Sequence, residues 1–129
     1  MSTFRIVLDT NILVSALLSA QGNPAKVYRM FLSGAITVLY GMDILAEYQD
    51  ALHRRRLIIP RDDAATVLRA IRQYGVQIEP VPRSVALTDE DDRVFYDTAK
   101  AAGAYLITGN IRHYPQEPFI MTPSEFLEL

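Results

Sequence analysis

The sequence predicts an α/β fold in which a mainly parallel central sheet of about five strands is covered by helices on both faces. Short apolar runs of strand length alternate with longer stretches that repeat apolar residues at the helical period. The first run, Ile6-Val7-Leu8, is apolar at consecutive positions, which is typical of a strand buried on both faces. Glycine or proline separates most of these segments. Together these features predict a doubly wound arrangement.

Each expected element follows from its local residues. The strands are expected, from their apolar and β-branched runs, at residues 4–8, 36–40, 76–78, 105–107 and 119–121. The helices are expected, from apolar residues three and four apart, after residue 11, from 24 to 33, from 42 to 55, from about 62 through Ile71, up to 102, and from 123 onward.

Several residues mark the ends of these helices. Asn23 suits an N-cap and Pro24 the first helical position, while Gly34 suits the end of the same helix. The pair Asp62-Asp63 suits the first turn of the helix expected to begin at about residue 62. Residues Thr88 to Asp91 form a near capping box, with Asp where Glu or Gln is usual.

The bulk composition restricts the function. A chain of 129 residues suits one domain, expected over residues 1–129. The absence of cysteine excludes disulfides, thiol chemistry and cysteine-ligated zinc, and it is compatible with a cytoplasmic location. No apolar run is long enough to span a membrane, and no secretory signal is visible. The net charge of −2 shows no overall basic surface, so a polyanion would be held by a local patch or by metal ions.

Acidic residues from three distant segments are expected at one edge of the sheet. Asp9 follows the first strand, and the fourth strand is expected beside the first, which brings in Thr108, Gly109 and Asn110. The helix before the fourth strand starts with 89-DEDD-92, and Glu47 lies in the second turn of the helix after the second strand. Clustered carboxylates repel one another unless a cation neutralises them, and hard oxygen ligands suit Mg²⁺ or Mn²⁺.

Each of these residues also has a structural interpretation. Asp9 can cap the following helix, and Asp89, Glu90 and Asp91 suit helix capping better than metal binding. Asp92 has a weaker capping role and is the better ligand candidate. Asp97 is expected on the surface.

The basic residues carry weaker predictions. His53 and His113 have no partner at ligand spacing, so neither is predicted to be a catalytic base. Arg54, Arg55 and Arg56 end a helix, where cations are favoured, and they are also candidate contacts to RNA phosphates.

Four short motifs, taken in order, resemble the PIN domain family. They are Asp9-Thr10-Asn11 after a strand, Ala46-Glu47-Tyr48, Asp92 with Ala99 seven residues later, and 105-YLITGN-110. The apolar positions of Phe95-Tyr96-x-x-Ala99 match as well, and the similarity spans essentially the whole chain. The sequence looks most similar to the VapC-like toxin branch.

The resemblance implies a three-layer α/β/α fold and a metal-dependent ribonuclease, the toxin partner of a small antitoxin. Asp9, Glu47 and Asp92 would then hold Mg²⁺ or Mn²⁺, with Thr10, Asn11 and Thr108 as supporting polar residues and Asn110 in the catalytic set. A homodimer is implied in the same way.

The sequence departs from that pattern at the fourth acid. Some branches have Asp where Asn110 stands, and VapC-like members have an acid three residues later, where this chain has His113. Either alignment lacks the fourth carboxylate, which bears on the second metal ion and on the strength of catalysis.

Three other functions are compatible with parts of the pattern. A PIN-like module that binds RNA or protein without hydrolysis agrees with the missing acid. A haloacid-dehalogenase-like phosphatase with Asp9 as nucleophile would need a second Asp at the position of Asn11. A receiver domain would need an Asp after the third strand, where Ile78-Glu79-Pro80 has none.

Overall fold

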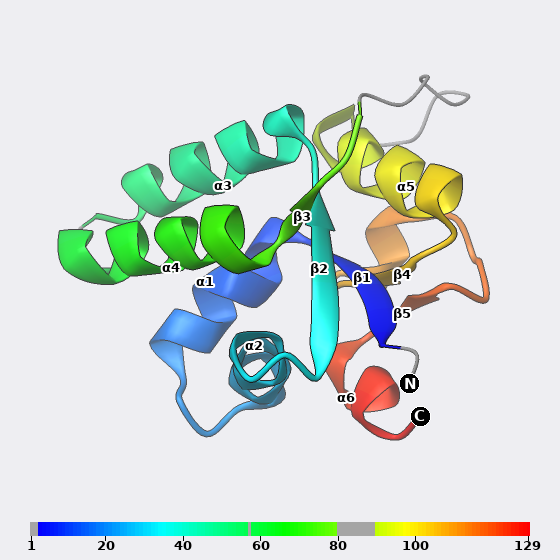
Figure 1. Cartoon of the computed structure of the whole chain (residues 1–129), viewed down its shortest axis with the longest axis horizontal. Helices are drawn as coiled ribbons and strands as arrows, with labels where there is room; N and C mark the ends of the chain where they lie inside the picture. Colours follow the sequence, from blue (N-terminus) through cyan, green and yellow to red (C-terminus); the bar gives the residue numbers. More distant parts are fainter. Residues whose placement is uncertain (1–2, 57, 80–89) are drawn as a thin grey trace.

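The computed structural model describes residues 3–56, 58–79 and 90–129, with the side chains of residues 90 and 91 left aside. Its centre is a five-stranded sheet in the order β3-β2-β1-β4-β5, in which every neighbouring pair is parallel (Figure 1). The strands are β1 (Phe4–Leu8), β2 (Ile36–Tyr40), β3 (Val76–Gln77), β4 (Tyr105–Ile107) and β5 (Ile120–Met121). The predicted placement of the fourth strand beside the first is confirmed.

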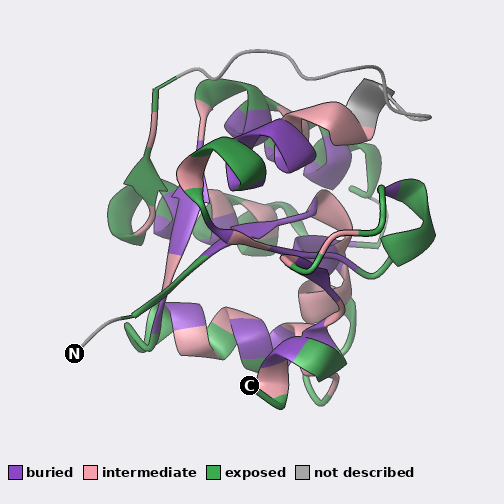
Figure 2. Ribbon diagram, turned by 90° about the vertical axis from the view of Figure 1, so that its right-hand side faces the viewer, coloured by how far each residue is buried: buried purple, intermediate pink, exposed green. Residues whose placement is uncertain are grey.

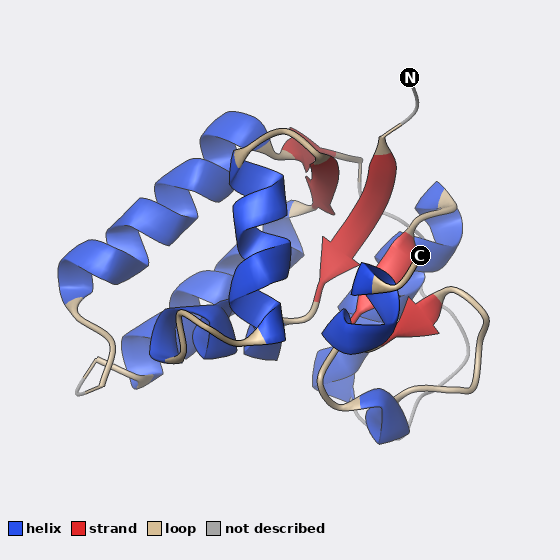
Figure 3. Cartoon of the chain, turned by 90° about the horizontal axis from the view of Figure 1, so that it is seen from below, coloured by secondary structure: helices blue, strands red, loops and turns tan. Residues whose placement is uncertain are grey.

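Helices lie on both sides of this sheet, as the three-layer α/β/α prediction requires. They are α1 (Thr10–Leu18), α2 (Asn23–Leu32), α3 (Met42–Arg54), α4 (Arg61–Tyr74), α5 (Glu90–Ala102) and α6 (Pro123–Leu127), with a 3-10 turn η1 (Ile111–His113). Figure 2 shows α6 on the side of the sheet opposite α5. In Figure 3, α1 to α4 form a group on the left of the strands. The elements β4, β5 and η1 lie on the right, near the C-terminus.

The core is built around β1. Ile6, Val7 and Leu8 have no exposed surface, as expected for a central strand covered on both faces. Two large aromatic side chains from different helices, Tyr48 of α3 and Phe95 of α5, stack in this core with ring centroids 6.2 Å apart. Because these helices are packed on the core through these rings, their polar residues are held at defined positions near the end of β1.

Most element ends agree with the sequence, with a few shifts. Gly22 rather than Asn23 is the N-cap of α2, because Gly22 has the extended backbone and Asn23 is already helical. Gly34 ends that helix with φ +85°, a conformation that costs a residue with a side chain more than glycine. The capping box expected from Thr88 begins outside the described residues, whereas Thr122 and Glu125 form one at α6 that the sequence analysis did not identify.

No helix within the described part of the chain is long and apolar enough to cross a bilayer.

Candidate functional site

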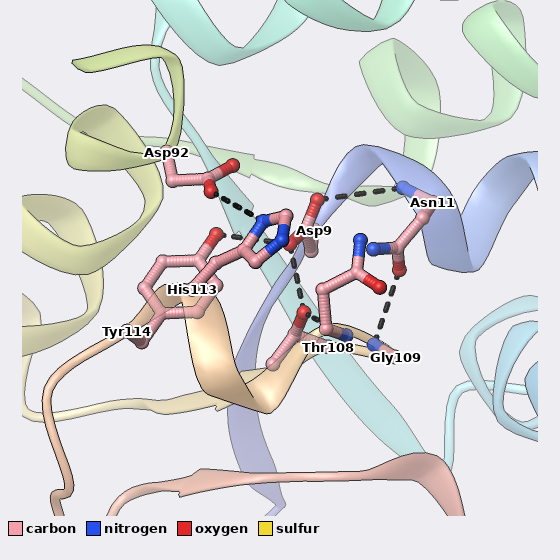
Figure 4. A network of polar contacts seen from close by, with 8 residues as sticks. Asp9, Asn11, Asp92, Thr108, Gly109, His113 and Tyr114 are labelled. Carbon is pink, nitrogen blue, oxygen red and sulfur yellow. Dashed lines mark hydrogen bonds and ion pairs between the residues drawn. The ribbon is translucent and has the colours of Figure 1, made fainter. Parts of the chain in front are cut away.

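Asp9 lies at the carboxyl end of β1 and is only 5% exposed. Its Oδ2 atom accepts hydrogen bonds from the hydroxyl groups of Thr108 at 2.8 Å and Tyr114 at 2.9 Å (Figure 4). Its Oδ1 atom accepts a longer bond of 3.4 Å from the backbone N–H of Asn11, as the N-cap of α1. The capping interpretation and the functional-site interpretation of Asp9 therefore apply together.

The surroundings of this carboxylate are polar but uncharged. The three groups that donate to Asp9 are neutral, and no cationic side chain of the described residues forms an ion pair with it. A buried carboxylate with only neutral partners remains attractive to a cation, because hydrogen bonds alone do not neutralise its charge. This charge also acts on Tyr48, whose pKa is raised above its ordinary value by burial and then by Asp9.

The turn after β4 supplies the second wall of the site. Thr108 is fully buried, and its Oγ1 atom accepts the backbone N–H of Asn110 at 3.0 Å while it donates to Asp9. The backbone N–H of Gly109 donates to the side-chain Oδ1 of Asn11 at 3.1 Å. A Cβ atom at Gly109 would lie 3.4 Å from that same oxygen, an ordinary van der Waals distance, so this contact does not by itself require glycine.

The remaining supporting residues differ in their contacts. Asn110 is exposed at the start of η1, and its backbone rather than its amide contacts Thr108. Thr10 begins α1, and its Oγ1 atom is buried without a hydrogen-bond partner among the described residues. The structure thus brings Asn11 and Thr108 into the Asp9 network, while Thr10 stands next to Asp9 in the chain without a hydrogen bond from its side chain.

Asp92, in the first turn of α5, contacts His113 of η1. The Nδ1 atom of His113 lies 3.2 Å from Asp92 Oδ2, and the Asp92 side chain is 15% exposed. Sequence spacing gave His113 no partner, and the structure supplies Asp92, because η1 folds the chain after β4 back toward the start of α5. His53 keeps a position on the exposed end of α3, where its Nε2 atom is 3.4 Å from Arg56 Nη1.

Glu47 is engaged on the surface of α3. Its Oε1 atom lies 3.6 Å from Arg54 Nη2, and Arg54 also pairs with Asp50 at 2.6 Å. The Glu47 side chain is 30% exposed, in contrast to buried Asp9. A cation bound by Glu47 would therefore compete with Arg54 for this carboxylate.

Asp97 was expected on the surface, and that expectation was wrong. It is 7% exposed, and Thr98 next to it is 3% exposed. The neighbouring positions Phe95, Tyr96 and Ala99 are buried as well. The middle of α5 is therefore enclosed on more than one side, and a surface position cannot be inferred from helical spacing there.

Comparison with known proteins now identifies the family. The PIN domain family model matches residues 5–112. The chain belongs to the PIN domain family. A protein of Methanocaldococcus jannaschii, described as uncharacterized, is 28% identical over 109 residues, which cover 82% of this chain and 70% of the relative.

A solved structure supports the same fold. It is that of VapBC2 from Rickettsia felis bound to a DNA fragment from their promoter. The match has a TM-score of 0.63 and 18% sequence identity, and it covers 92% of this chain and 97% of that chain. The fold of this PIN domain is therefore that of the matched chain of the VapBC2 structure.

The donor groups of this PIN domain fit a hard divalent cation. Carboxylate oxygens of Asp9 and Asp92 are ligands of the type that Mg²⁺ and Mn²⁺ prefer, and Mg²⁺ is commonly held by one or two carboxylates while it keeps several waters. Among residues 3–56, 58–79 and 90–129, no three His, Cys, Asp or Glu side chains are grouped closely enough to hold a metal ion.

Sequence reasoning missed two tyrosines of this site. Tyr114 contacts Asp9 directly, and Tyr48 donates to the carbonyl of Leu8, the residue before Asp9, at 2.6 Å. Tyr48 stood inside a motif that was used for Glu47 alone. Tyr114 follows the turn after β4 by a few residues, and only the fold of η1 directs its hydroxyl group to Asp9.

Proposed function

We propose that this PIN domain is a Mg²⁺- or Mn²⁺-dependent endoribonuclease that hydrolyses RNA phosphodiester bonds. The observation that carries the proposal is the buried Asp9 carboxylate, which is held by Thr108 and Tyr114 at the carboxyl end of the central strand. Asp92 belongs to the same region, since His113, which contacts it, is adjacent in the chain to Tyr114, which contacts Asp9. Metal-dependent nuclease activity is also what membership of the PIN family suggests.

The residues of the proposed site have distinct parts in this reaction. Asp9 and Asp92, with Glu47 after it leaves Arg54, would hold the cation. The bound cation would lower the pKa of a water molecule that attacks the phosphorus and would neutralise the charge that develops there. Thr108 and the N–H of Asn11 fix the orientation of Asp9. Asn110 offers an amide oxygen but no charge where other branches have Asp.

The RNA would be held partly by the basic end of α3. Arg54, Arg55 and Arg56 are exposed there, although Arg54 is already paired with two acids. Because the net charge of the chain is negative, binding through so few arginines would depend on the metal ions as well.

We also infer that the nuclease acts as the toxin of a toxin–antitoxin pair in the cytoplasm. The fold likeness to a chain of the VapBC2 structure supports a small antitoxin partner and a dimeric assembly of the toxin. Co-expression with the product of the adjacent gene, followed by size-exclusion chromatography with light scattering, tests both. Growth arrest by the chain alone that is relieved by that product is expected, and unimpaired growth on overexpression contradicts a toxin.

The nuclease is tested by cleavage of a mixed pool of single-stranded RNA with Mg²⁺, with Mn²⁺ and with chelator. The parent is compared with Asp9→Asn and Asp92→Asn. Asp62→Asn is the matched control, because it neutralises an exposed acid in the first turn of α4, outside the proposed metal site. Metal-dependent cleavage that is lost in both site variants and kept in the control is expected. Cleavage that survives in Asp9→Asn contradicts the proposal.

A second candidate function is a PIN-like module that binds RNA or protein without hydrolysis. The contact of His113 with Asp92 favours it, because an imidazole occupies one carboxylate at the place where VapC-like members have another acid. Asn110→Asp separates the two functions if the parent is inert. Cleavage gained in this variant indicates a nuclease weakened by one missing charge, and continued inactivity together with RNA binding by the parent indicates the module.

A further inference from the structure

The hydroxyl group of Tyr114 is directed to one oxygen of Asp9. The donor–acceptor distance is 2.9 Å, and Tyr114 is 7% exposed, so water does not compete freely for this bond. The residue ends η1, where its own backbone N–H donates to the carbonyl of Ile111 at 3.2 Å. Both the backbone and the ring of Tyr114 are therefore held in place.

The two oxygens of Asp9 have unequal hydrogen bonds. Oδ2 accepts two short bonds, from Thr108 at 2.8 Å and from Tyr114 at 2.9 Å. Oδ1 accepts a single bond of 3.4 Å from the N–H of Asn11, which is near the limit of a hydrogen bond. A carboxylate oxygen offers about two lone-pair directions, so the two hydroxyl groups use the capacity of Oδ2 and leave capacity at Oδ1.

We propose that Tyr114 is a positioning residue that, together with Thr108, holds the Asp9 carboxylate so that Oδ1 is the oxygen offered to the divalent cation. The inference rests on the proposed function, since it concerns the same metal site. Hydrogen bonds to the ligands of a metal ion fix their orientation, and loss of one typically lowers metal affinity by about 10- to 100-fold. Without the Tyr114 hydroxyl, Asp9 can rotate and Oδ2 competes with Oδ1.

The test measures Mn²⁺ affinity by electron paramagnetic resonance of the free ion, on the whole chain and without RNA. Tyr114→Phe removes the hydroxyl group and keeps the ring, and we expect it to weaken Mn²⁺ binding about tenfold. Tyr96→Phe is the matched control, because Tyr96 is also buried and its hydroxyl group donates to Glu117 at 3.3 Å rather than to Asp9. Tyr96→Phe is expected to bind Mn²⁺ like the parent.

The partner hydroxyl gives an independent measurement on the same oxygen. Thr108→Val is expected to weaken Mn²⁺ binding, and Thr108→Ser, which restores the hydroxyl group, is expected to recover it. Thermal unfolding first establishes that both variants are folded. If Thr108 has only a structural role, folded Thr108→Val then binds Mn²⁺ as tightly as the parent. If Tyr114→Phe does not fold, this pair tests whether the hydroxyl donors to Oδ2 set the Mn²⁺ affinity, and unchanged affinity in folded Thr108→Val overturns the inference.

The outcomes separate this inference from the proposed function. Mn²⁺ affinity that is lost in Asp9→Asn but within twofold of the parent in Tyr114→Phe overturns the positioning role alone. An equal loss in Tyr96→Phe also overturns it, since the effect would then follow from any buried hydroxyl. A parent without Mn²⁺ affinity, or an Asp9→Asn variant that binds like the parent, overturns the metal site and both proposals.

Discussion

Asp9 and Glu47 belong to the same predicted metal site, but their surroundings differ. Asp9 follows a central strand, is 5% exposed and accepts three hydrogen bonds from neutral groups. Glu47 lies on a helix, is 30% exposed in its side chain and pairs with Arg54. Asp9 is held in one orientation by buried neighbours at the end of its strand. Glu47, on the surface of a helix, keeps more side-chain freedom and has Arg54 as an alternative partner.

This contrast predicts the largest effect for the loss of Asp9. Asp9→Asn keeps the size of the side chain and removes the charge, so RNA cleavage with Mn²⁺ is expected to fall by more than about a hundredfold. Glu47→Gln is expected to lower the cleavage rate less, by about tenfold, because Arg54 already competes with the cation for Glu47 in the parent. Initial cleavage rates at saturating Mn²⁺ measure both, and a greater loss in Glu47→Gln would reverse the comparison.

Thr108→Val probes the polar region through stability. The substitution removes one donor to buried Asp9 and the acceptor of the Asn110 N–H, so the free energy of unfolding is expected to fall by about 1–3 kcal/mol. Thr66→Val on α4 is the control, because the Thr66 hydroxyl donates to the carbonyl of Asp62 at an exposed position. Equal losses in urea titrations of the two variants would show that the Asp9 network adds no stability.

Tyr48→Phe is expected to have an intermediate effect. The Tyr48 hydroxyl donates to the Leu8 carbonyl at 2.6 Å in a fully buried position, and its loss is expected to cost about 1 kcal/mol at pH 7. Urea unfolding measures it, with exposed Tyr74→Phe as the control.

The same tyrosine predicts a pH dependence. Burial and the charge of Asp9 raise the pKa of Tyr48 above 10.0, the ordinary value expected in the unfolded chain. The unfolded state therefore loses the proton first, and the stability of the parent should fall as the pH rises above about 10. Tyr48→Phe lacks this contribution, so the difference between parent and variant should shrink there. A constant difference from pH 8 to 11 contradicts it.

The smallest effect on stability is expected at the exposed ion pairs of α3 around Glu47. Arg54→Ala removes ion pairs to Asp50 and Glu47 that are largely open to solvent, and it should change the free energy of unfolding by less than about 0.5 kcal/mol. Mn²⁺ affinity is expected to rise in Arg54→Ala, because Glu47 is released for metal binding. An unchanged or lower affinity contradicts the competition between Arg54 and the cation.

Several parts of the site followed from the sequence because parallel topology restricts them. A charged residue directly after an apolar run marks the end of a strand, and the next strands in a doubly wound sheet end at the same edge. Asp9 and Thr108 were therefore expected together, and they are hydrogen-bonded. The Asn11 side chain also accepts the backbone N–H of Gly109, a contact that the sequence did not specify.

Other parts did not follow, because short irregular segments have no period to interpret. The pairing of His113 with Asp92 depends on η1, a single 3-10 turn that is too short to leave a repeating pattern in the sequence. The burial of Asp97 depends on which elements enclose α5, and helical spacing alone does not give that. Thr88 and Asp89 lie outside the described residues, so the capping box expected there stays a prediction.

The sequence by itself determined the central place of β1, the position of β4 beside it on the side opposite β2, and the acid at the end of β1. These features depend on local hydrophobic pattern and on the handedness of parallel connections, which are the same in every chain with this alternation. Only the tertiary structure decided which hydroxyl groups meet Asp9 and which partner Glu47 has. Those contacts join residues such as Asp9 and Tyr114, 105 positions apart, and they depend on packing at a scale that no sequence period encodes.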